Sequence, residues 1–291
     1  MIQWNEEVTW IAAKILNAQE ELEVKVMLTP GIVQGGPAPK TKWLLDGVSK
    51  RKKDVVAKLT AIRFSPDDMD MLSGSPSLRR TYLNEVLVQS DLEYRVSLDS
   101  YEKALARRNA LLDLLREGRT TRASFAFWDA LLIKHGEVLF TKRRAFCEWL
   151  DVQGKERGYK LTYQAKPVTK NLLDEYAQRE VAAGHTLIGP HKDDVLLQMS
   201  PLQQQQSTAH ELGRFGSRGQ QRMAVFWLKK QASEWMMYQT GARPLLLLDD
   251  VFSELDEGHR KEVLDQLDGS QVILTSIEPV ILQRKHLEIA L

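Results

Sequence analysis

The chain has 291 residues, of which 43% are hydrophobic and 27% charged, a composition typical of globular proteins with a well-filled core. Its net charge of +1 excludes a global attraction to polyanions, so any affinity for nucleic acid has to come from local patches. The one cysteine, Cys147, excludes an intrachain disulfide and a cysteine-based zinc site. An acidic N-terminus and the lack of a long apolar run argue against a signal peptide or membrane span, so we expect a cytoplasmic protein.

The first part of the chain is expected to be rich in β-structure. Residues 22–28 alternate apolar and polar side chains, which predicts a strand, and residues 29–42 hold the prolines and glycines of a turn-rich connection. Asp46–Gly47 is typical of a hairpin turn and leads into the basic run 50–53. A second short strand is expected over residues 59–64.

The pattern changes at about residue 75 to that of helices. Apolar residues recur every three or four positions over 77–115 and again over 124–150, which predicts amphipathic helices packed antiparallel across the break at 118–124. A third helix is expected over 171–183. Basic clusters occur at 50–53, 79–80, 107–108 and 142–144. They are candidates for contacts to DNA phosphates, although each cluster alone is more typical of a solvated face.

After residue 185 strands and helices alternate. We expect a strand at 194–199, a glutamine-rich loop at 203–206, a helix at 219–238, a strand at 245–248, a helix at 258–267 and a strand at 271–275. The strand–helix–strand order and the uninterrupted leucines of 245–248 predict a parallel sheet covered on both faces.

An acid pair, Asp249 and Asp250, ends the leucine strand, at the edge where ligands of open α/β sheets bind. Asp249 is placed to hold Mg²⁺, directly or through water, and Asp250 to orient or deprotonate a water that attacks a γ-phosphate. The alternative is a strand end that caps its turn with acid. The sequence SELD at 253–256 argues against it.

The segment GSRGQ at 216–220 precedes a helix, and Ser217 suits the N-cap position, where amides and helix dipole form an anion site. The alternative is a plain glycine-rich helix start. Arg222, one turn later, is expected to contact either phosphate or an acid. The segment 186–194 holds a histidine and two acids without zinc spacing, so we interpret it as a salt-bridged turn entering a strand.

A phosphate-binding loop, G-x-x-x-x-G-K-[ST], does not occur in the 291 residues. The single Gly-Lys pair is followed by Glu156, and Trp149 stands where the earlier glycine belongs.

Taken together, the motifs resemble the RecF family over essentially the whole chain. They are FSPDDM (64–69), GSPSLRRTYLN (74–84), YEKALARRNALL (101–112), GPHKDD (189–194), GSRGQQR (216–222) and LLLLDDVFSELD (245–256). The resemblance implies an α/β fold, an ABC-type (SMC-head-like) nucleotide-binding domain that is incomplete at its N-terminus and carries an inserted α-helical lobe. Residues 1–72 and 185–291 would form the ATPase lobe and 73–184 the helical lobe.

The resemblance also implies a function in DNA replication and recombinational repair. Such proteins bind DNA at single-strand gaps beside duplex in an ATP-dependent way and help recombinase loading and the SOS response. The implied cofactors are ATP and Mg²⁺. The implied partners are DNA, RecR- and RecO-type proteins and a second copy in an ATP-dependent homodimer, with no membrane.

Site residues carry over by motif. Ser217, Arg218, Gly219 and Gln220 would form the signature loop that contacts ATP, with Asp256 in a subunit-contacting loop, Asp249 as the Mg²⁺ ligand and Asp250 as the catalytic base. The DNA contacts expected from the basic clusters are Arg79, Arg80, Lys142, Arg143 and Arg144. Two departures affect these roles. Lys192 replaces the arginine usual in the family, and Thr275–Ser276 stand near the usual switch histidine.

The family begins with a strand, the phosphate loop and a helix, a unit of about 30 residues or more that is missing ahead of Met1. We expect a misplaced start or a truncated gene rather than a working variant. As an enzyme the isolated chain is expected to be inactive. The alternative is a non-catalytic remnant that binds DNA or protein.

Overall fold

The computed structural model describes residues 6–16, 20–56, 58–200, 210–253, 255–267 and 269–277. Its contacts divide the chain into two compact units, Met1–Ala61 and Ile62–Leu291. The predicted glutamine-rich loop at 203–206 and Glu254 of the SELD segment lie outside the described residues. Across the part of the chain that the structure describes, no helix has both the length and the apolarity needed to cross a bilayer.

The first unit is an antiparallel sheet in the order β1-β2-β5-β6. Its strands are β1 (Thr9–Leu16), β2 (Glu21–Leu28), β5 (Thr41–Leu45) and β6 (Val48–Lys50), with a small β3–β4 hairpin (Ile32–Val33, Gly36–Pro37) and helix α1 (Lys52–Val56). Asp46 and Gly47 have φ of 49° and 75° and join β5 to β6, which confirms the predicted hairpin turn. Strand β1 was not predicted, because its sequence TWIAAKIL does not alternate.

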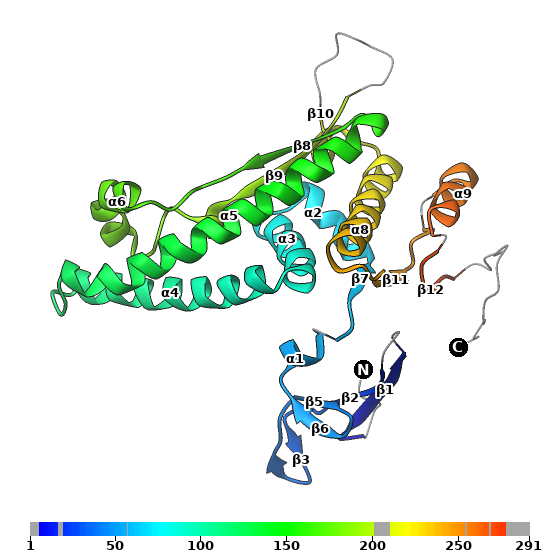
Figure 1. Cartoon of the computed structure of the whole chain (residues 1–291), viewed down its shortest axis with the longest axis horizontal. Coiled ribbons are helices and arrows are strands. Elements are labelled where there is room, and N and C mark those ends of the chain that lie inside the picture. Colours follow the sequence, from blue (N-terminus) through cyan, green and yellow to red (C-terminus); the bar gives the residue numbers. More distant parts are fainter. Residues whose placement is uncertain are drawn as a thin grey trace. The chain divides into compact units, whose positions relative to one another are not determined.

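The helical part of the second unit contains α3 (Pro76–Ser90), α4 (Leu92–Arg116), α5 (Ala126–Gly154) and α6 (Lys170–Ala183). Helices α4 and α5 run side by side, as Figure 1 shows and as their spacing predicted. The predicted helix over 77–115 is in fact two helices. Asp91 ends the first and caps the second by accepting a hydrogen bond from the amide of Tyr94 at 2.9 Å.

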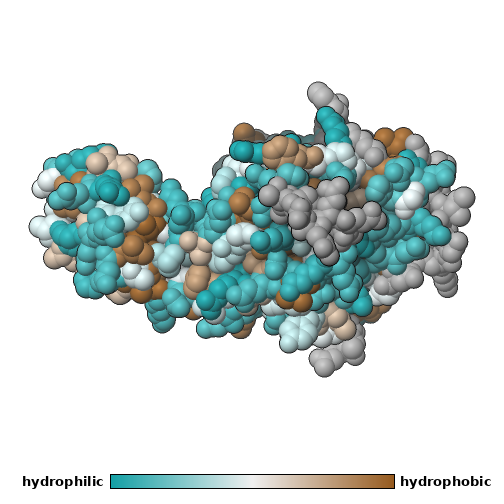
Figure 2. All heavy atoms as spheres, turned by 90° about the horizontal axis from the view of Figure 1, so that it is seen from above, coloured by the Kyte–Doolittle hydropathy of each residue, from teal (hydrophilic) through white to brown (hydrophobic). Residues whose placement is uncertain are grey.

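An antiparallel sheet in the order β10-β9-β8 belongs to the same unit: β8 (Tyr159–Gln164), β9 (Asp194–Met199) and β10 (His210–Glu211). Strand β9 was predicted and β8 was not. Short helices η4 (Pro190–Lys192) and α7 (Leu212–Phe215) flank this sheet along the chain. Figure 2 shows polar side chains over most of the drawn face, with apolar ones gathered near the end of the lobe that carries α6.

The third sheet has the order β12-β11-β7, with β7 (Ala61–Phe64), β11 (Leu245–Asp249) and β12 (Val272–Thr275). Strands β11 and β12 are parallel, as predicted. The expected cover on both faces is incomplete, because Leu246 and Leu248 are buried while Ile273 is 56% exposed. Helices η1 (Pro66–Met69), α2 (Asp70–Ser73), α8 (Arg218–Thr240) and α9 (Glu257–Asp265) complete the unit.

Candidate functional site

The acid pair lies at the carboxyl end of β11. Asp249 is the last residue of the strand, and its Oδ1 accepts a hydrogen bond from Thr275 Oγ1 on β12 at 2.6 Å. Asp250 follows with a φ of 49°, a left-handed conformation that is uncommon for a residue other than glycine. Its amide donates to the Thr275 carbonyl at 3.3 Å. Residues in such rare conformations cluster at functional sites.

The signature loop, residues 216–220, starts helix α8. Ser217 is the N-cap, as predicted: its Oγ accepts from the Gln220 amide at 3.3 Å, and Gln220 Oε1 accepts from the Ser217 amide at 2.9 Å. Ser217, Arg218 and Gln220 are exposed. The loop therefore presents a capped helix N-terminus to solvent, a place that favours anions.

Arg222 joins the signature helix to the acid pair. Its side chain is buried, and Nε donates to the Val251 carbonyl at 3.1 Å while a second guanidinium nitrogen donates to the Asp250 carbonyl. Its guanidinium also lies over the Phe64 ring, 5.6 Å from the centroid. Two of the contacts of Arg222 are therefore to main-chain carbonyls, a kind of partner that the sequence did not indicate. Arg222 binds the main chain of the loop after β11 and fixes it to α8.

Asp256 caps α9. Its Oδ1 accepts a hydrogen bond from the His259 amide at 2.8 Å, and its Oδ2 lies 2.9 Å from His259 Nδ1. The backbone hydrogen bond from His259 lowers the pKa of the Asp256 carboxyl. The side chain is exposed, so it remains accessible beyond its capping role.

The residues at the end of β11 fit one part of a Mg²⁺–nucleotide site. Among the residues that the structure describes, no group of three or more His, Cys, Asp or Glu side chains surrounds a possible metal position. Mg²⁺ is commonly bound by one or two carboxylates together with substrate phosphates, which Asp249 suits. The donors that cradle those phosphates are absent from the 291-residue sequence.

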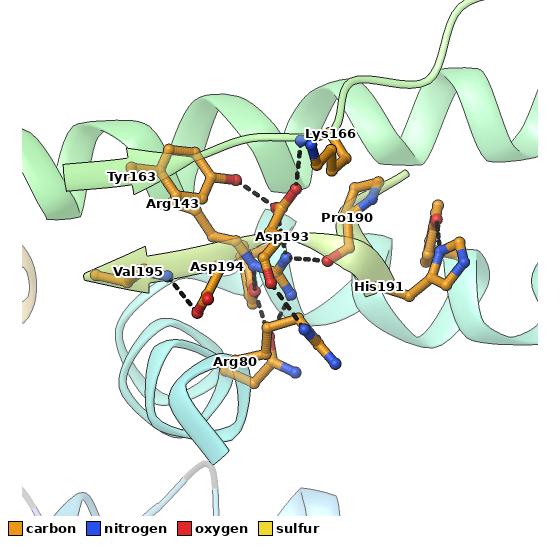
Figure 3. Close-up of polar contacts among 12 residues, drawn as sticks. Arg80, Arg143, Tyr163, Lys166, Pro190, His191, Asp193, Asp194 and Val195 are labelled. Carbon is orange, nitrogen blue, oxygen red and sulfur yellow. Dashed lines mark hydrogen bonds and ion pairs between the residues drawn. The ribbon is translucent and has the colours of Figure 1, made fainter. Parts of the chain in front are cut away.

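The GPHKDD segment forms a network of buried and partly buried charges, drawn in Figure 3. The carboxylate of Asp193, 1% exposed, accepts from Arg143 at 2.8 Å, from the Tyr163 hydroxyl at 2.5 Å and from the Lys166 amide at 2.7 Å. Asp194 accepts two hydrogen bonds from Arg79, at 2.6 and 3.0 Å. This supports the interpretation of the segment as a salt-bridged turn entering a strand.

His191 of the same segment has both ring nitrogens engaged. Nδ1 lies 2.7 Å from the Tyr101 hydroxyl and Nε2 lies 3.0 Å from the Thr186 carbonyl. Burial lowers the pKa of His191 to about 4. The hydrogen bond to the Thr186 carbonyl acts in the opposite direction and raises the pKa, but its effect is smaller. The ring is therefore neutral at physiological pH and acts as a spacer between α4 and the segment.

The predicted DNA contacts occupy different environments. Arg143 is 2% exposed and also donates to the Tyr94 hydroxyl and the Pro190 carbonyl. A phosphate contact by Arg143 does not fit this placement, because its guanidinium is held inside by Asp193. Lys142 pairs with Asp91 at 2.8 Å, whereas Arg144 is exposed, with Glu148 3.9 Å away.

Arg79 and Arg80 are only partly exposed. Arg79 is committed to Asp194, and Arg80 donates to the Asp193 carbonyl at 2.7 Å. Burial, followed by the nearby Arg143 charge, lowers the pKa of Arg80. Of the five predicted residues, Arg144 has the geometry best suited to a surface phosphate.

Comparison with known proteins gives one consistent answer. No family model matches the chain. Curated relatives named "DNA replication and repair protein RecF" include those of Herpetosiphon aurantiacus (34% identical, covering 79% of this chain and 63% of the relative), Thermomicrobium roseum (33%, 94% and 76%) and Moorella thermoacetica (33%, 84% and 68%). The chain thus spans about two thirds to three quarters of the length of these relatives.

The fold has close matches among solved structures. Two of them, described as the recombination mediator protein RecF in the RecFOR pathway with ATPrS and with ATP, superpose with TM-scores of 0.75 and 0.78 over 94% and 96% of this chain. They cover 76% and 77% of those chains, at 24% and 22% identity. The predicted fold class, an ABC-type α/β domain with a helical lobe, is confirmed.

Proposed function

The chain belongs to the RecF family, and from this premise we propose that it acts in DNA replication and recombinational repair as one half of an ATP-dependent, DNA-binding dimer. The observation that carries the proposal is the bond between Arg222 on the signature helix and the carbonyls of Asp250 and Val251. It ties a loop suited to a phosphate group to an acid pair suited to Mg²⁺ and water. The two parts are thereby fixed within one subunit.

Bound ATP with Mg²⁺ would hold the two subunits together, and hydrolysis of its γ-phosphate would release them. Asp249 would hold the metal, oriented by the hydroxyl of Thr275. Asp250 would position a water and accept its proton, with the main chain held by Arg222. Ser217, Arg218, Gly219 and Gln220 would contact nucleotide bound by the second copy, and Asp256 would face that copy from the start of α9.

DNA would bind through surface charges of the helical lobe, chiefly Arg144, with Lys142 shared between phosphate and its acids. Recombinase loading at single-strand gaps and partners of the RecR and RecO types belong to the same proposal. It is supported by the relatives' name and by the pathway named for the two matched structures. A role in the SOS response would follow from acting at such gaps.

The test uses fluorescence anisotropy with labelled gapped duplex, plain duplex and single strands. A phosphate-loop segment is joined ahead of residue 1, and binding is measured with and without ATP and Mg²⁺. We expect tighter binding to gapped duplex when nucleotide is present, and a weaker salt dependence in Arg144→Ala than in the parent protein. Arg119→Ala, at an exposed ion pair with Glu117, is the control. If each of the three DNAs is bound equally well with and without ATP and Mg²⁺, the proposal is contradicted.

A second candidate function follows from the missing phosphate-loop motif. In that case these 291 residues would bind DNA or protein without nucleotide and without catalysis. The same assay separates the two candidates, because such a protein would bind DNA equally well with and without the added segment.

A further inference from the structure

Helix α7, which directly precedes the signature loop, approaches helix α2 unusually closely. A Cβ atom built on Gly213 would lie 2.2 Å from the Leu72 carbonyl oxygen and 2.7 Å from its carbon. No side chain fits there, so glycine is required by contact with backbone rather than by its own φ. Since α7 ends at Phe215, directly before Gly216, its contact with α2 sets where the loop begins.

The first turn of α8 is hydrogen-bonded to α7 and to the residue that follows it. Gln221 Nε2 donates to the Leu212 carbonyl at 3.0 Å and to the Gly216 carbonyl at 3.2 Å, and the Gly216 amide donates to the Leu212 carbonyl at 3.0 Å. These hydrogen bonds connect the residues before the loop to those after it. A shift of α7 therefore has to move the loop or break them.

Helix α2 in turn is fastened by Arg79. Its Nη1 donates to the Met71 carbonyl at 3.2 Å and to the Gly74 carbonyl at 2.9 Å, near both ends of α2, while Nε and Nη2 pair with Asp194. The pair is largely buried, at 14% and 19% exposure. One guanidinium thus links the first residue of β9 to α2, with all its contacts inside the unit.

A second, independent tie joins this region to α8. Asp68 of η1, just before α2, pairs with Lys229 of α8 at 2.8 Å, and both side chains are nearly buried. The segment of η1 and α2 is consequently held to β9 by Arg79 and to α8 by Lys229.

We propose that Arg79 and Gly213 are positioning residues for the signature loop, and that the path from Asp194 through Arg79, α2 and Gly213 fixes residues 216–220 in the orientation needed to meet a second subunit. This assigns Arg79 an internal role in place of the predicted DNA contact. That the loop meets nucleotide on a second copy rests on the proposed function. The positioning itself does not.

Hydrogen exchange on the 291-residue chain tests the positioning directly. Arg79→Lys keeps the charge but cannot serve Asp194 and both carbonyls together, and Gly213→Ala inserts the clashing Cβ. We expect the amides of Gly216, Ser217, Gln220 and Gln221 to exchange about tenfold faster or more in each variant, because local opening loses hydrogen bonds, while amides in the middle of α5 keep their rates.

Two matched controls accompany these variants. Arg119→Lys changes an exposed arginine, and Gly136→Ala adds a Cβ whose nearest neighbour is 3.5 Å away. Neither should alter exchange at residues 216–221. Unchanged exchange there in Arg79→Lys, or an equal rise throughout the chain, would overturn the proposal, and Arg79→Lys alone decides if Gly213→Ala does not fold.

A second measurement separates this inference from the proposed function. With the phosphate-loop segment added, nucleotide-dependent dimerisation is followed by light scattering. If the parent protein dimerises and Arg79→Lys dimerises at least about tenfold more weakly, both the proposed function and the positioning role are supported. No dimerisation in the parent, together with faster exchange in Arg79→Lys, would remove the proposed function and leave the positioning role standing. An unchanged dimer in Arg79→Lys would overturn the positioning role in assembly.

Discussion

Arg222 of α8 donates a hydrogen bond to the main-chain carbonyl of Asp250, the residue that directly follows β11. The helix that carries the signature loop is thereby fastened to the turn that carries the second acid. Asp250 has a φ of 49°, a conformation that costs on the order of 1–3 kcal/mol and persists when neighbours enforce it. The hydrogen bond from Arg222 to the Asp250 carbonyl and the one from the Asp250 amide to the Thr275 carbonyl supply that constraint.

Arg222→Met should therefore destabilise the chain and loosen this turn. Losing charge-assisted hydrogen bonds to the carbonyls of Asp250 and Val251 is expected to lower the free energy of unfolding by about 1–3 kcal/mol. Urea denaturation gives the free energy, and hydrogen exchange at residues 249–253 reports the local effect. Arg119→Met, at an exposed site, is the control. Equal effects of the two substitutions would contradict the role given to Arg222.

Asp193→Asn breaks the buried pair with Arg143, in which both side chains are 2% exposed. Leaving the arginine without its counter-charge is expected to cost about 3–5 kcal/mol. Asp174→Asn removes a carboxylate from an exposed pair with Lys170 and should cost less than about 1 kcal/mol. The comparison is made by urea denaturation at neutral pH. A loss below about 1 kcal/mol for Asp193→Asn would show that the network is not essential to the fold.

His191 should make stability depend on pH. Its folded-state pKa of about 4 lies below the unfolded value of 6.5, so the unfolded chain binds the proton first as the pH falls. The contribution is fully present above pH 6.5 and is lost between there and pH 4, by about 3 kcal/mol from this residue. His191→Gln should flatten the decline of unfolding free energy between pH 7 and 5. An unchanged slope would mean that the pKa of His191 is the same in the folded and the unfolded chain.

Much of the second unit follows from residue patterns, because helix spacing and strand runs are local. The ends of α6, α8, β9 and β11 fall within one or two residues of the predicted ones. Strands β1 and β8 were not predicted. The sequence of β1 does not alternate. In β8, Tyr159, Leu161 and Tyr163 alternate with polar residues, so a signal was present over six residues and was missed. The turn at Asp46–Gly47 followed from local chemistry alone.

Side-chain roles were harder to predict, because basic residues look alike in sequence. Arg143 stands on the buried stripe of α5 with Leu139, Phe146 and Leu150, at the spacing of one helix face. That register was the available signal that its charge points inward. Arg108 on α4 is a second example. It is fully buried on the same helix face as Tyr101, Ala104 and Leu112, and it pairs with Glu180 at 2.6 Å.

The position of Gly213 against Leu72 had no signal in the sequence. The two residues are far apart along the chain, and their contact is one between backbones. Nothing in residue type or periodicity marks such an approach, whereas the acid pair and the capping box at Ser217 are encoded within a few neighbouring residues.

The 291-residue chain alone is expected to bind ATP weakly or not at all. A phosphate loop provides most of the amide donors and the lysine that hold the β- and γ-phosphates, and without it Asp249 and Asp250 present negative charge to a polyanion. Isothermal calorimetry with Mg²⁺ is the measurement. Micromolar, Mg²⁺-dependent binding would contradict this expectation and would point to phosphate donors elsewhere in the chain.

With a phosphate-loop segment added, two substitutions should separate the roles of the acid pair and the signature loop. Asp250→Asn should preserve ATP binding and dimerisation but abolish hydrolysis, because it removes the group that orients or deprotonates water and leaves phosphate contacts in place. Ser217→Arg should keep nucleotide affinity in the monomer and block dimerisation, because a bulky cation would fill the helix N-terminus that faces the second copy. Calorimetry, light scattering and phosphate release give the three readouts. Loss of monomer ATP binding in Ser217→Arg, or normal dimerisation and hydrolysis, would show that residues 216–220 do not act on the nucleotide of a second subunit.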